Sequence, residues 1–166
     1  HMHRGRNGLA LWDDAVRLGI ETRKKLRALA ATFASPSRDE RTAWFFDPFV
    51  PDVVTLKGSK VSPDLDAVPW EKIPTEVLLR EQACWTLTPG AKWHGFRHSA
   101  PGWAMTDPNK LTLITPGFDR QTGEYAPIGI SATVLAAYLR EHNIVPEKCD
   151  LNSILFLLTP GVESSK

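Results

Sequence analysis

The chain has 166 residues, of which 42% are hydrophobic, so it is long enough to bury one ordinary domain core. Its 20 basic and 19 acidic residues give a formal net charge of +1 and are spread along the chain, so no nucleic-acid or membrane-surface partner is expected. No apolar stretch reaches the ~20 residues that span a bilayer, and no signal-peptide pattern opens the sequence, so we expect a soluble protein.

Both ends of the sequence indicate a piece of a longer protein. The opening tripeptide HMH (1–3) is typical of an expression-tag remnant. Residues 159–166 (TPGVESSK) have the pattern of a helix start, with Thr159 as the cap, Pro160 in the first turn and Glu163 near the positive end of the helix dipole. We therefore interpret the chain as truncated at its C-terminal end.

The first predicted element is a long amphipathic helix over residues 9–34. Its apolar residues recur at spacings near three and four, at Trp12, Val16, Ile20, Leu26, Ala30 and Phe33. Residues 35–40 (SPSRDE) end this helix. Its basic middle, from Arg23 to Arg27, is either a surface for an acidic partner or a solvated helix face, and we favour the solvated face. Residues 4–40 are thus predicted to be a helical segment that precedes the domain.

Residues 41–166 are predicted to form one small α/β domain. Proline and aromatic residues in 44–80 interrupt regular structure and indicate short strands joined by ordered loops. Later apolar runs predict three strands, and a helical pattern begins at Ser131 as its cap. The strands are WTLTP at 85–89, KLTLIT at 110–115 and SILFLLT at 153–159, and the helix is SATVLAAYLREHN at 131–143. Their order predicts a small mixed or antiparallel sheet with helices on one side.

Each of these three apolar runs leads into the same tripeptide, Thr-Pro-Gly, at 88–90, 115–117 and 159–161. Proline cannot continue a β-ladder and glycine permits turns that other residues resist, so the tripeptide is a general strand terminator. Alternatively, the turns place the residues that follow them, Asp119 above all, at one edge of the sheet, where sites in α/β folds lie. The residues alone favour the first interpretation, in which the tripeptide only ends a strand. The two interpretations are compatible.

The other candidate site residues give weaker signals. His94, in KWHGF, is either a packed histidine bonded to backbone groups, which we favour, or an acid, a base or a stacking partner. Residues 117–129 are punctuated by glycine but lack the spacings that cradle phosphate. The remaining histidines and cysteines considered are His98, His142, Cys84 and Cys149. They lack metal-ligand spacing, and the distant cysteines favour a reducing cytoplasm over a disulfide framework.

Three segments carry a resemblance to a known family. They are WFFDPFVPDVV at 44–54, CWTLTPGAKWHGF at 84–96 and the run from MTDPNKL to LLTPG at 105–161. Together they resemble the bacterial ornithine, lysine and arginine decarboxylases, which are pyridoxal-phosphate enzymes of the aspartate-aminotransferase fold. The segment PEKCDLNSILFLLTP (146–160) is most similar to the ornithine enzymes. The resemblance therefore implies ornithine as the first choice of substrate and lysine or arginine as the second.

The resemblance also implies roles for three residues. In this family an acid shortly after the TPG turn meets the distal amine of the substrate, and the matching residue here is Asp119, where the family often has Glu. Asp107, in TDP, is a second candidate for the same task. His94 falls in a WHG segment typical of the family and is expected to be an active-site neighbour.

The cofactor lysine expected of such an enzyme is missing from this sequence. In the family a Ser-x-His-Lys segment supplies the lysine that forms a Schiff base with the cofactor. No His-Lys dipeptide occurs in the chain, so no catalytic residue is expected here and pyridoxal phosphate is not expected to be bound by this piece alone. The resemblance then implies that residues 41–166 are a small-domain part of the fold and that the helix in residues 4–40 is a connector from an upstream cofactor domain of the same polypeptide. Further partners are other copies of the protein in a homodimer or higher oligomer. A noncatalytic regulatory or assembly module is the alternative.

Overall fold

The computed structural model describes residues 6–33, 45–98, 100–102 and 104–160. The helices are α1 (Arg6–Phe33), η2 (Trp70–Lys72), α2 (Thr75–Arg80), η3 (Gln82–Trp85) and α3 (Ala132–Glu141). The strands are β1 (Asp47–Pro48), β2 (Val53–Leu56), β3 (Leu65–Pro69), β4 (Lys110–Ile114), β5 (Lys148–Cys149) and β6 (Ser153–Leu157). Within these residues no helix is long and apolar enough to cross a membrane. The tag remnant at 1–3 and the helix expected after Pro160 lie outside the described part.

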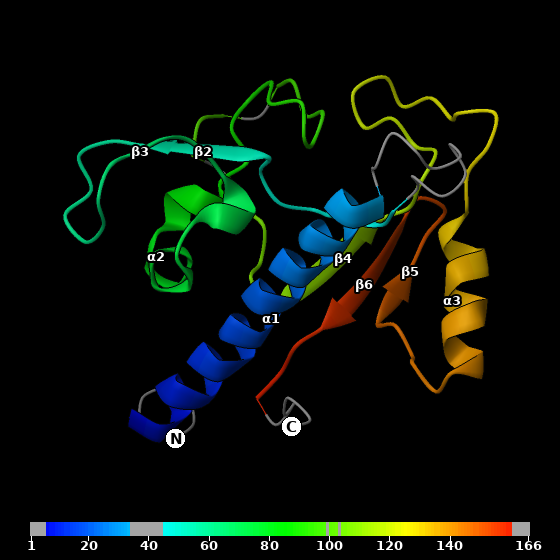
Figure 1. Cartoon of the computed structure of the whole chain (residues 1–166), viewed down its shortest axis with the longest axis horizontal. Coiled ribbons are helices and arrows are strands. Elements are labelled where there is room, and N and C mark those ends of the chain that lie inside the picture. Colours follow the sequence, from blue (N-terminus) through cyan, green and yellow to red (C-terminus); the bar gives the residue numbers. More distant parts are fainter. Residues whose placement is uncertain (1–5, 34–44, 99, 103, 161–166) are drawn as a thin grey trace.

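Helix α1 lies between two hydrophobic clusters, as the predicted amphipathic pattern requires. On one side Ile20 packs with buried residues of β2, β3 and α2 and with the two tryptophans Trp70 and Trp85. On the other side Leu26 packs against the cluster formed by the larger sheet and α3. Figure 1 shows α1 running diagonally, with β2, β3 and α2 to its left and β4, β6, β5 and α3 to its right. The long helix is therefore a partition shared by both cores.

The larger sheet is antiparallel throughout, with strand order β1-β4-β6-β5. In its central pair, Leu111 is opposite Phe156 and Leu113 is opposite Ile154, so these four side chains share one face. The same cluster contains residues of both α1 and α3, among them Leu26, Leu135, Ala136 and Leu139. The predicted small antiparallel sheet with helices on one side is confirmed. The second sheet is a separate antiparallel pair of β2 and β3.

The predicted helix at 131–143 is confirmed as α3, and its cap is the expected one. The Ser131 hydroxyl accepts a hydrogen bond from the Val134 amide at 3.4 Å. The predicted strand at 85–89 is wrong. Trp85 ends the 3₁₀ helix η3, its indole donates to the Leu78 carbonyl at 2.8 Å, and the segment keeps only an isolated bridge between Thr86 and Met105. Burial of the tryptophan in the α2 core thus overrides the local strand preference.

The basic middle of α1 is not a solvated face, so that interpretation is also wrong. Arg23 is 1% exposed, and it donates to the carbonyls of Pro108 at 2.9 Å and Lys110 at 2.7 Å. Its guanidinium also lies 5.3 Å from the centre of the Trp85 ring, and burial lowers the pKa of Arg23 to about 10. The neighbouring cations Lys24 and Arg27 donate in the same way to backbone carbonyls of Ile73, Pro51 and Val50.

We expect Arg23→Met to lower the free energy of unfolding by about 2–4 kcal/mol, because it removes a buried donor from the carbonyls of Pro108 and Lys110. The measurement is urea unfolding, and the control is Lys25→Met, an exposed cation of the same helix. The control tests the charge change alone and should alter stability by less than about 0.5 kcal/mol. Equal losses in the two variants would contradict a structural role for the Arg23 contacts.

Candidate functional site

As far as the structure describes them, the three Thr-Pro-Gly turns do not all lie at one end of the sheet, so the alternative interpretation fails for the third turn. The turn at 115–117 follows β4, and Thr159 and Pro160 follow β6. Since β4 and β6 are antiparallel, these turns leave the sheet at opposite ends. The turn at 88–90 follows the 3₁₀ helix η3 and ends no strand. The second turn leads directly to Asp119, and Lys92 and Trp93, which follow the first turn, line the cavity that contains Asp119.

After this second turn the chain forms a β-hairpin, here called the Asp119 loop (residues 117–130). Two backbone hydrogen bonds join its arms: the Asp119 amide donates to the Glu124 carbonyl at 3.0 Å, and the Ala126 amide donates to the Gly117 carbonyl at 2.8 Å. At its base, a Cβ atom at Gly117 would lie 2.7 Å from the Gly129 Cα atom, and Gly117 has φ +91°. Only glycine satisfies both conditions, so the TPG glycine here closes the loop by backbone contact.

Asp119 lies at the exposed tip of this loop as an anion. Its Oδ1 atom accepts hydrogen bonds from the amides of Gln121 at 2.7 Å and Thr122 at 3.3 Å. These backbone donors hold the pKa of Asp119 below its ordinary value. The carboxylate therefore stabilises its own loop and stays ionised at neutral pH, which leaves it able to attract a cation from solvent.

A polar cavity of about 190 Å³ opens beside this carboxylate. Its lining residues are Asp52, Lys92, Trp93, Phe118, Asp119, Arg120 and Gln121. Arg120 donates through Nη2 to Asp47 Oδ2 at 2.8 Å, which ties the loop to β1. The cavity thus combines two carboxylates, two cations and two aromatic rings, a set that suits small charged ligands better than apolar ones.

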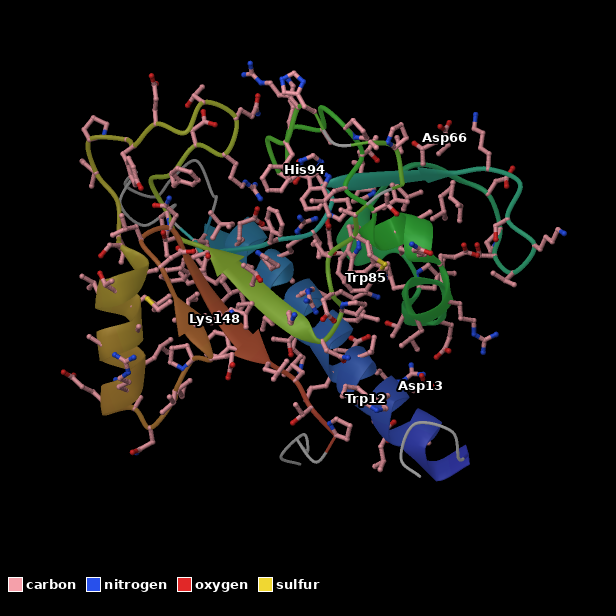
Figure 2. The ribbon with its side chains drawn as sticks, turned by 180° about the vertical axis from the view of Figure 1, so that it is seen from behind. Trp12, Asp13, Asp66, Trp85, His94 and Lys148 are labelled. Atoms are coloured by element: carbon pink, nitrogen blue, oxygen red, sulfur yellow. The ribbon has the colours of Figure 1, made fainter. Side chains whose placement is uncertain are left out.

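His94 is buried at the same end of the sheet. It is 4% exposed, and its ring nitrogens are both bonded to backbone groups, Nε2 to the Thr88 carbonyl at 2.8 Å and Nδ1 to the Phe96 amide at 2.9 Å. This is the packed arrangement favoured from the sequence. Figure 2 shows His94 near the loop edge of the molecule, away from Trp85, which lies deeper beside α2. His94 also lines a cavity of about 340 Å³ together with Arg120.

Asp107 is placed apart from the other two predicted residues. It precedes β4, whereas Asp119 follows it, so the strand separates them. The Asp107 carboxylate accepts from the Asn109 amide at 3.0 Å and lies 3.5 Å from Lys110 Nζ. The structure therefore brings His94 and the Asp119 loop to one end of the sheet and leaves Asp107 at the other.

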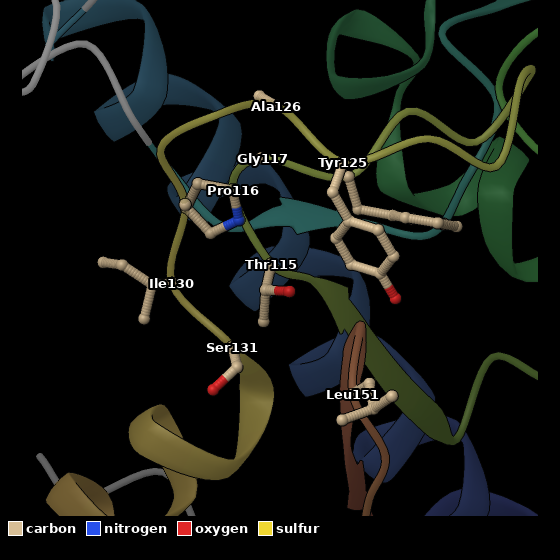
Figure 3. Close-up of a pocket in the computed structure, with 10 residues that line it drawn as sticks. Thr115, Pro116, Gly117, Tyr125, Ala126, Ile130, Ser131 and Leu151 are labelled. Carbon is tan, nitrogen blue, oxygen red and sulfur yellow. The ribbon is translucent and has the colours of Figure 1, made fainter.

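An apolar pocket of about 380 Å³ at the base of the Asp119 loop was not predicted. Figure 3 shows the loop passing from Tyr125 and Ala126 to Ser131 at the start of α3, with Leu151 on the opposite wall. The Tyr125 hydroxyl donates to Asn152 Oδ1 at 2.6 Å. Sequence reasoning also missed Arg120. Its partner Asp47 is 73 positions away, so no local spacing indicates the pair.

The described residues do not form a site for a metal or for pyridoxal phosphate, the cofactor that the resemblance implies. No group of three or more His, Cys, Asp or Glu side chains in this part of the chain is arranged to hold a metal ion. Lys24 donates to Ile73 and Thr75, and Lys110 lies beside Asp107. Lys92 lines a cavity that also contains the carboxylates of Asp52 and Asp119, so a phosphate group there would meet anions as well as cations. The residues present therefore do not fit this cofactor.

Comparisons with known proteins agree with the resemblance. A family model described as "Orn/Lys/Arg decarboxylase, major domain" matches residues 1–166. The constitutive ornithine decarboxylase of Escherichia coli K12 is 44% identical over 99% of this chain and 20% of that protein. The constitutive lysine decarboxylase of the same strain is 32% identical over 99% and 18%. The solved structure of the E. coli constitutive lysine decarboxylase matches with a TM-score of 0.66 and 30% identity, over 98% of this chain and 18% of that one. The chain thus spans about a fifth of the length of these relatives.

The repeated tripeptide offers a matched pair of substitutions, Gly117→Ala and Gly90→Ala. Both glycines have positive φ, +91° and +75°, so both variants carry a similar backbone strain. A Cβ atom at Gly90 meets nothing within 4 Å, whereas one at Gly117 meets the Gly129 backbone. We expect Gly117→Ala to cost about 1–3 kcal/mol more than Gly90→Ala in urea unfolding. Equal losses of unfolding free energy in the two variants would mean that Gly117 serves only to end the strand.

Proposed function

The chain belongs to the Orn/Lys/Arg decarboxylase family, and we propose that it is part of a pyridoxal-phosphate-dependent enzyme that converts ornithine to putrescine and carbon dioxide. The choice of ornithine as substrate rests on sequence identity, which is 44% to an ornithine decarboxylase and 32% to a lysine decarboxylase. Lysine or arginine is the alternative substrate. The full-length enzyme is proposed to act in the cytoplasm, in polyamine biosynthesis, as a homodimer or higher oligomer.

Within that enzyme we propose that this chain supplies the substrate-side wall of the active site. The proposal rests on the exposed, ionised carboxylate of Asp119 and on the rings of Trp93 and Phe118, which line the same cavity. A carboxylate beside aromatic faces suits the distal ammonium group of a diamino acid. Asp107 is the weaker candidate for this contact, because its carboxylate already has Lys110 and the Asn109 amide as partners.

The cofactor is proposed to bind to another part of the full-length polypeptide. Pyridoxal phosphate supplies the electron sink for decarboxylation. The wall formed by this chain would hold the far end of the substrate, orient it and reduce its exposure to water. A noncatalytic regulatory or assembly module of the same family is the second candidate, since no His-Lys dipeptide occurs in the 166 residues.

We expect the isolated chain neither to form an imine with pyridoxal phosphate nor to release carbon dioxide from ornithine, lysine or arginine. The reason is that its sequence has no His-Lys dipeptide and that its described residues form no site for the cofactor. The measurements are the absorbance spectrum with added cofactor, mass spectrometry after borohydride reduction, and carbon dioxide release. The full-length protein is the positive control for each. A single lysine modified by the reduced cofactor in the isolated chain would contradict this expectation, and a full-length protein inactive on all three amino acids would favour the noncatalytic module.

In the full-length enzyme, we expect Asp119→Asn to lower kcat/KM for ornithine, with a loss of transition-state stabilisation of about 1–3 kcal/mol. The reason is that the change removes a charge-assisted contact with the distal ammonium. The same change should have little effect on 2-aminopentanoate, which lacks that group. Steady-state kinetics on both substrates are the measurement, with Asp107→Asn as the matched carboxylate variant. Equal losses on the two substrates would mean that Asp119 only supports its loop, and a larger selective loss in Asp107→Asn would transfer the role to Asp107.

A further inference from the structure

We propose that the turn of residues 88–96, closed by His94, is a positioning element that fixes the Asp119 loop and thereby controls selectivity for the substrate's distal ammonium. His94 and Gly95 are thus positioning residues that act through Asp119. The effect on selectivity rests on the proposed function, whereas the mechanical link between the turn and the loop does not.

The imidazole of His94 joins the two ends of this closed turn. Thr88 at its start offers a carbonyl to His94 Nε2, and Phe96 at its end donates its amide to Nδ1. The Gly90 amide adds a third link, to the Phe96 carbonyl at 3.0 Å. Because one partner is an acceptor and the other a donor, the pattern requires a neutral ring with its proton on Nε2. His94 therefore holds backbone groups in this arrangement and has no free nitrogen for acid or base chemistry.

The closed turn touches the Asp119 loop through Gly95. This residue has φ +73°, and a Cβ atom on it would overlap the carbonyl oxygen of Arg120 and lie 3.6 Å from the Gln121 Cα atom. No side chain fits between the two backbones, so they are in direct contact. Arg120 and Gln121 directly follow Asp119 in the chain. A displacement of the Arg120 carbonyl would consequently move the carboxylate as well.

One further contact holds the same segment, and a ring of the closed turn lies at its cavity. The guanidinium of Arg120 is bonded to Asp47, and the side chain of Trp93, which belongs to the closed turn, lines the cavity that contains Asp119. The Trp93 ring packs on Phe49 with centroids 5.0 Å apart, and the His94 ring stacks on Phe96 at 5.3 Å. The turn is thus packed aromatic structure, rigid enough to position a loop whose residues 121–129 are exposed.

The test uses the full-length enzyme with Gly95→Ala and, as control, Gly58→Ala. Gly58 has φ +69° with nothing within 4 Å of a Cβ atom, so the two variants carry the same backbone strain but only Gly95→Ala presses on Arg120. For Gly95→Ala we expect kcat/KM for ornithine to fall about tenfold or more, with little change for 2-aminopentanoate, and faster amide hydrogen exchange at residues 119–126. Gly58→Ala should change neither.

A second pair of variants tests His94 in case Gly95→Ala does not fold. His94→Asn keeps an acceptor near the Nδ1 position, so it should retain much of the ornithine selectivity, whereas His94→Leu removes both hydrogen bonds and should lose it. Equal losses of kcat in both variants on both substrates would mean that His94 takes part in the chemistry and would overturn the inference.

The exchange measurement separates this inference from the proposed function. Unchanged exchange at residues 119–126 in both Gly95→Ala and His94→Leu overturns the positioning role, whatever the activities are. A wild-type enzyme that decarboxylates none of the three diamino acids overturns the proposed function, and faster exchange in the variants would still support the link between turn and loop. Equal loss of kcat/KM on ornithine and 2-aminopentanoate would overturn the control of selectivity.

Discussion

A buried guanidinium connects segments of this structure that are far apart in sequence. Arg23 extends from α1 to the carbonyls of Pro108 and Lys110, where β4 begins, and its face lies near Trp85 in the other core. Gly19 allows this approach, because a Cβ atom there would lie 3.0 Å from the Pro108 carbonyl oxygen and 2.9 Å from Arg23 Nη1. Since β4 leads directly into the second Thr-Pro-Gly turn, the position of the Asp119 loop depends on where this contact places the strand.

The same chemistry recurs along α1 and explains why its cations are not on a solvated face. The chain has 13 prolines and much irregular backbone, so many carbonyls near the helix have no amide partner in regular structure. Lys24 and Arg27 donate to several of them. The Arg27 side chain is only 11% exposed and also lies near Asp47, Asp52 and Glu71. Hydrogen bonds from charged donors contribute about 1.5–3 kcal/mol each, so these contacts can hold irregular segments that backbone pairing leaves unsatisfied.

The sequence sufficed where local pattern decides the outcome. Apolar periodicity predicted α1, apolar runs predicted β4 and β6, and a serine cap predicted the start of α3. Prediction from the sequence failed where contacts with residues distant in the chain determine the conformation. The segment at 85–89 has strand-like residues, but the indole of Trp85 is fixed by the Leu78 carbonyl inside the α2 core. The basic run of α1 has the composition of a surface, and only the fold reveals the carbonyls around Arg23. Likewise, a lone histidine indicates neither its partners nor its tautomer, so the role of His94 required the geometry of Thr88 and Phe96.

The same tripeptide, Thr-Pro-Gly, has different surroundings at its first and second occurrences. The second Thr-Pro-Gly ends strand β4 through the missing amide of proline and the freedom of glycine, whereas the first ends no strand. Gly90 then faces open space, whereas Gly117 lies against Gly129, and Gly95, in the turn that follows Gly90, lies against Arg120. The Asp119 loop is therefore fixed at its base and at its side by contacts of backbone on backbone. Such contacts depend on the absence of side chains at the glycines and not on the identity of the exposed residues at the tip. Tip residues other than Asp119, Arg120 and Thr122, whose side chains form hydrogen bonds, can consequently change in size or charge while the loop keeps its place.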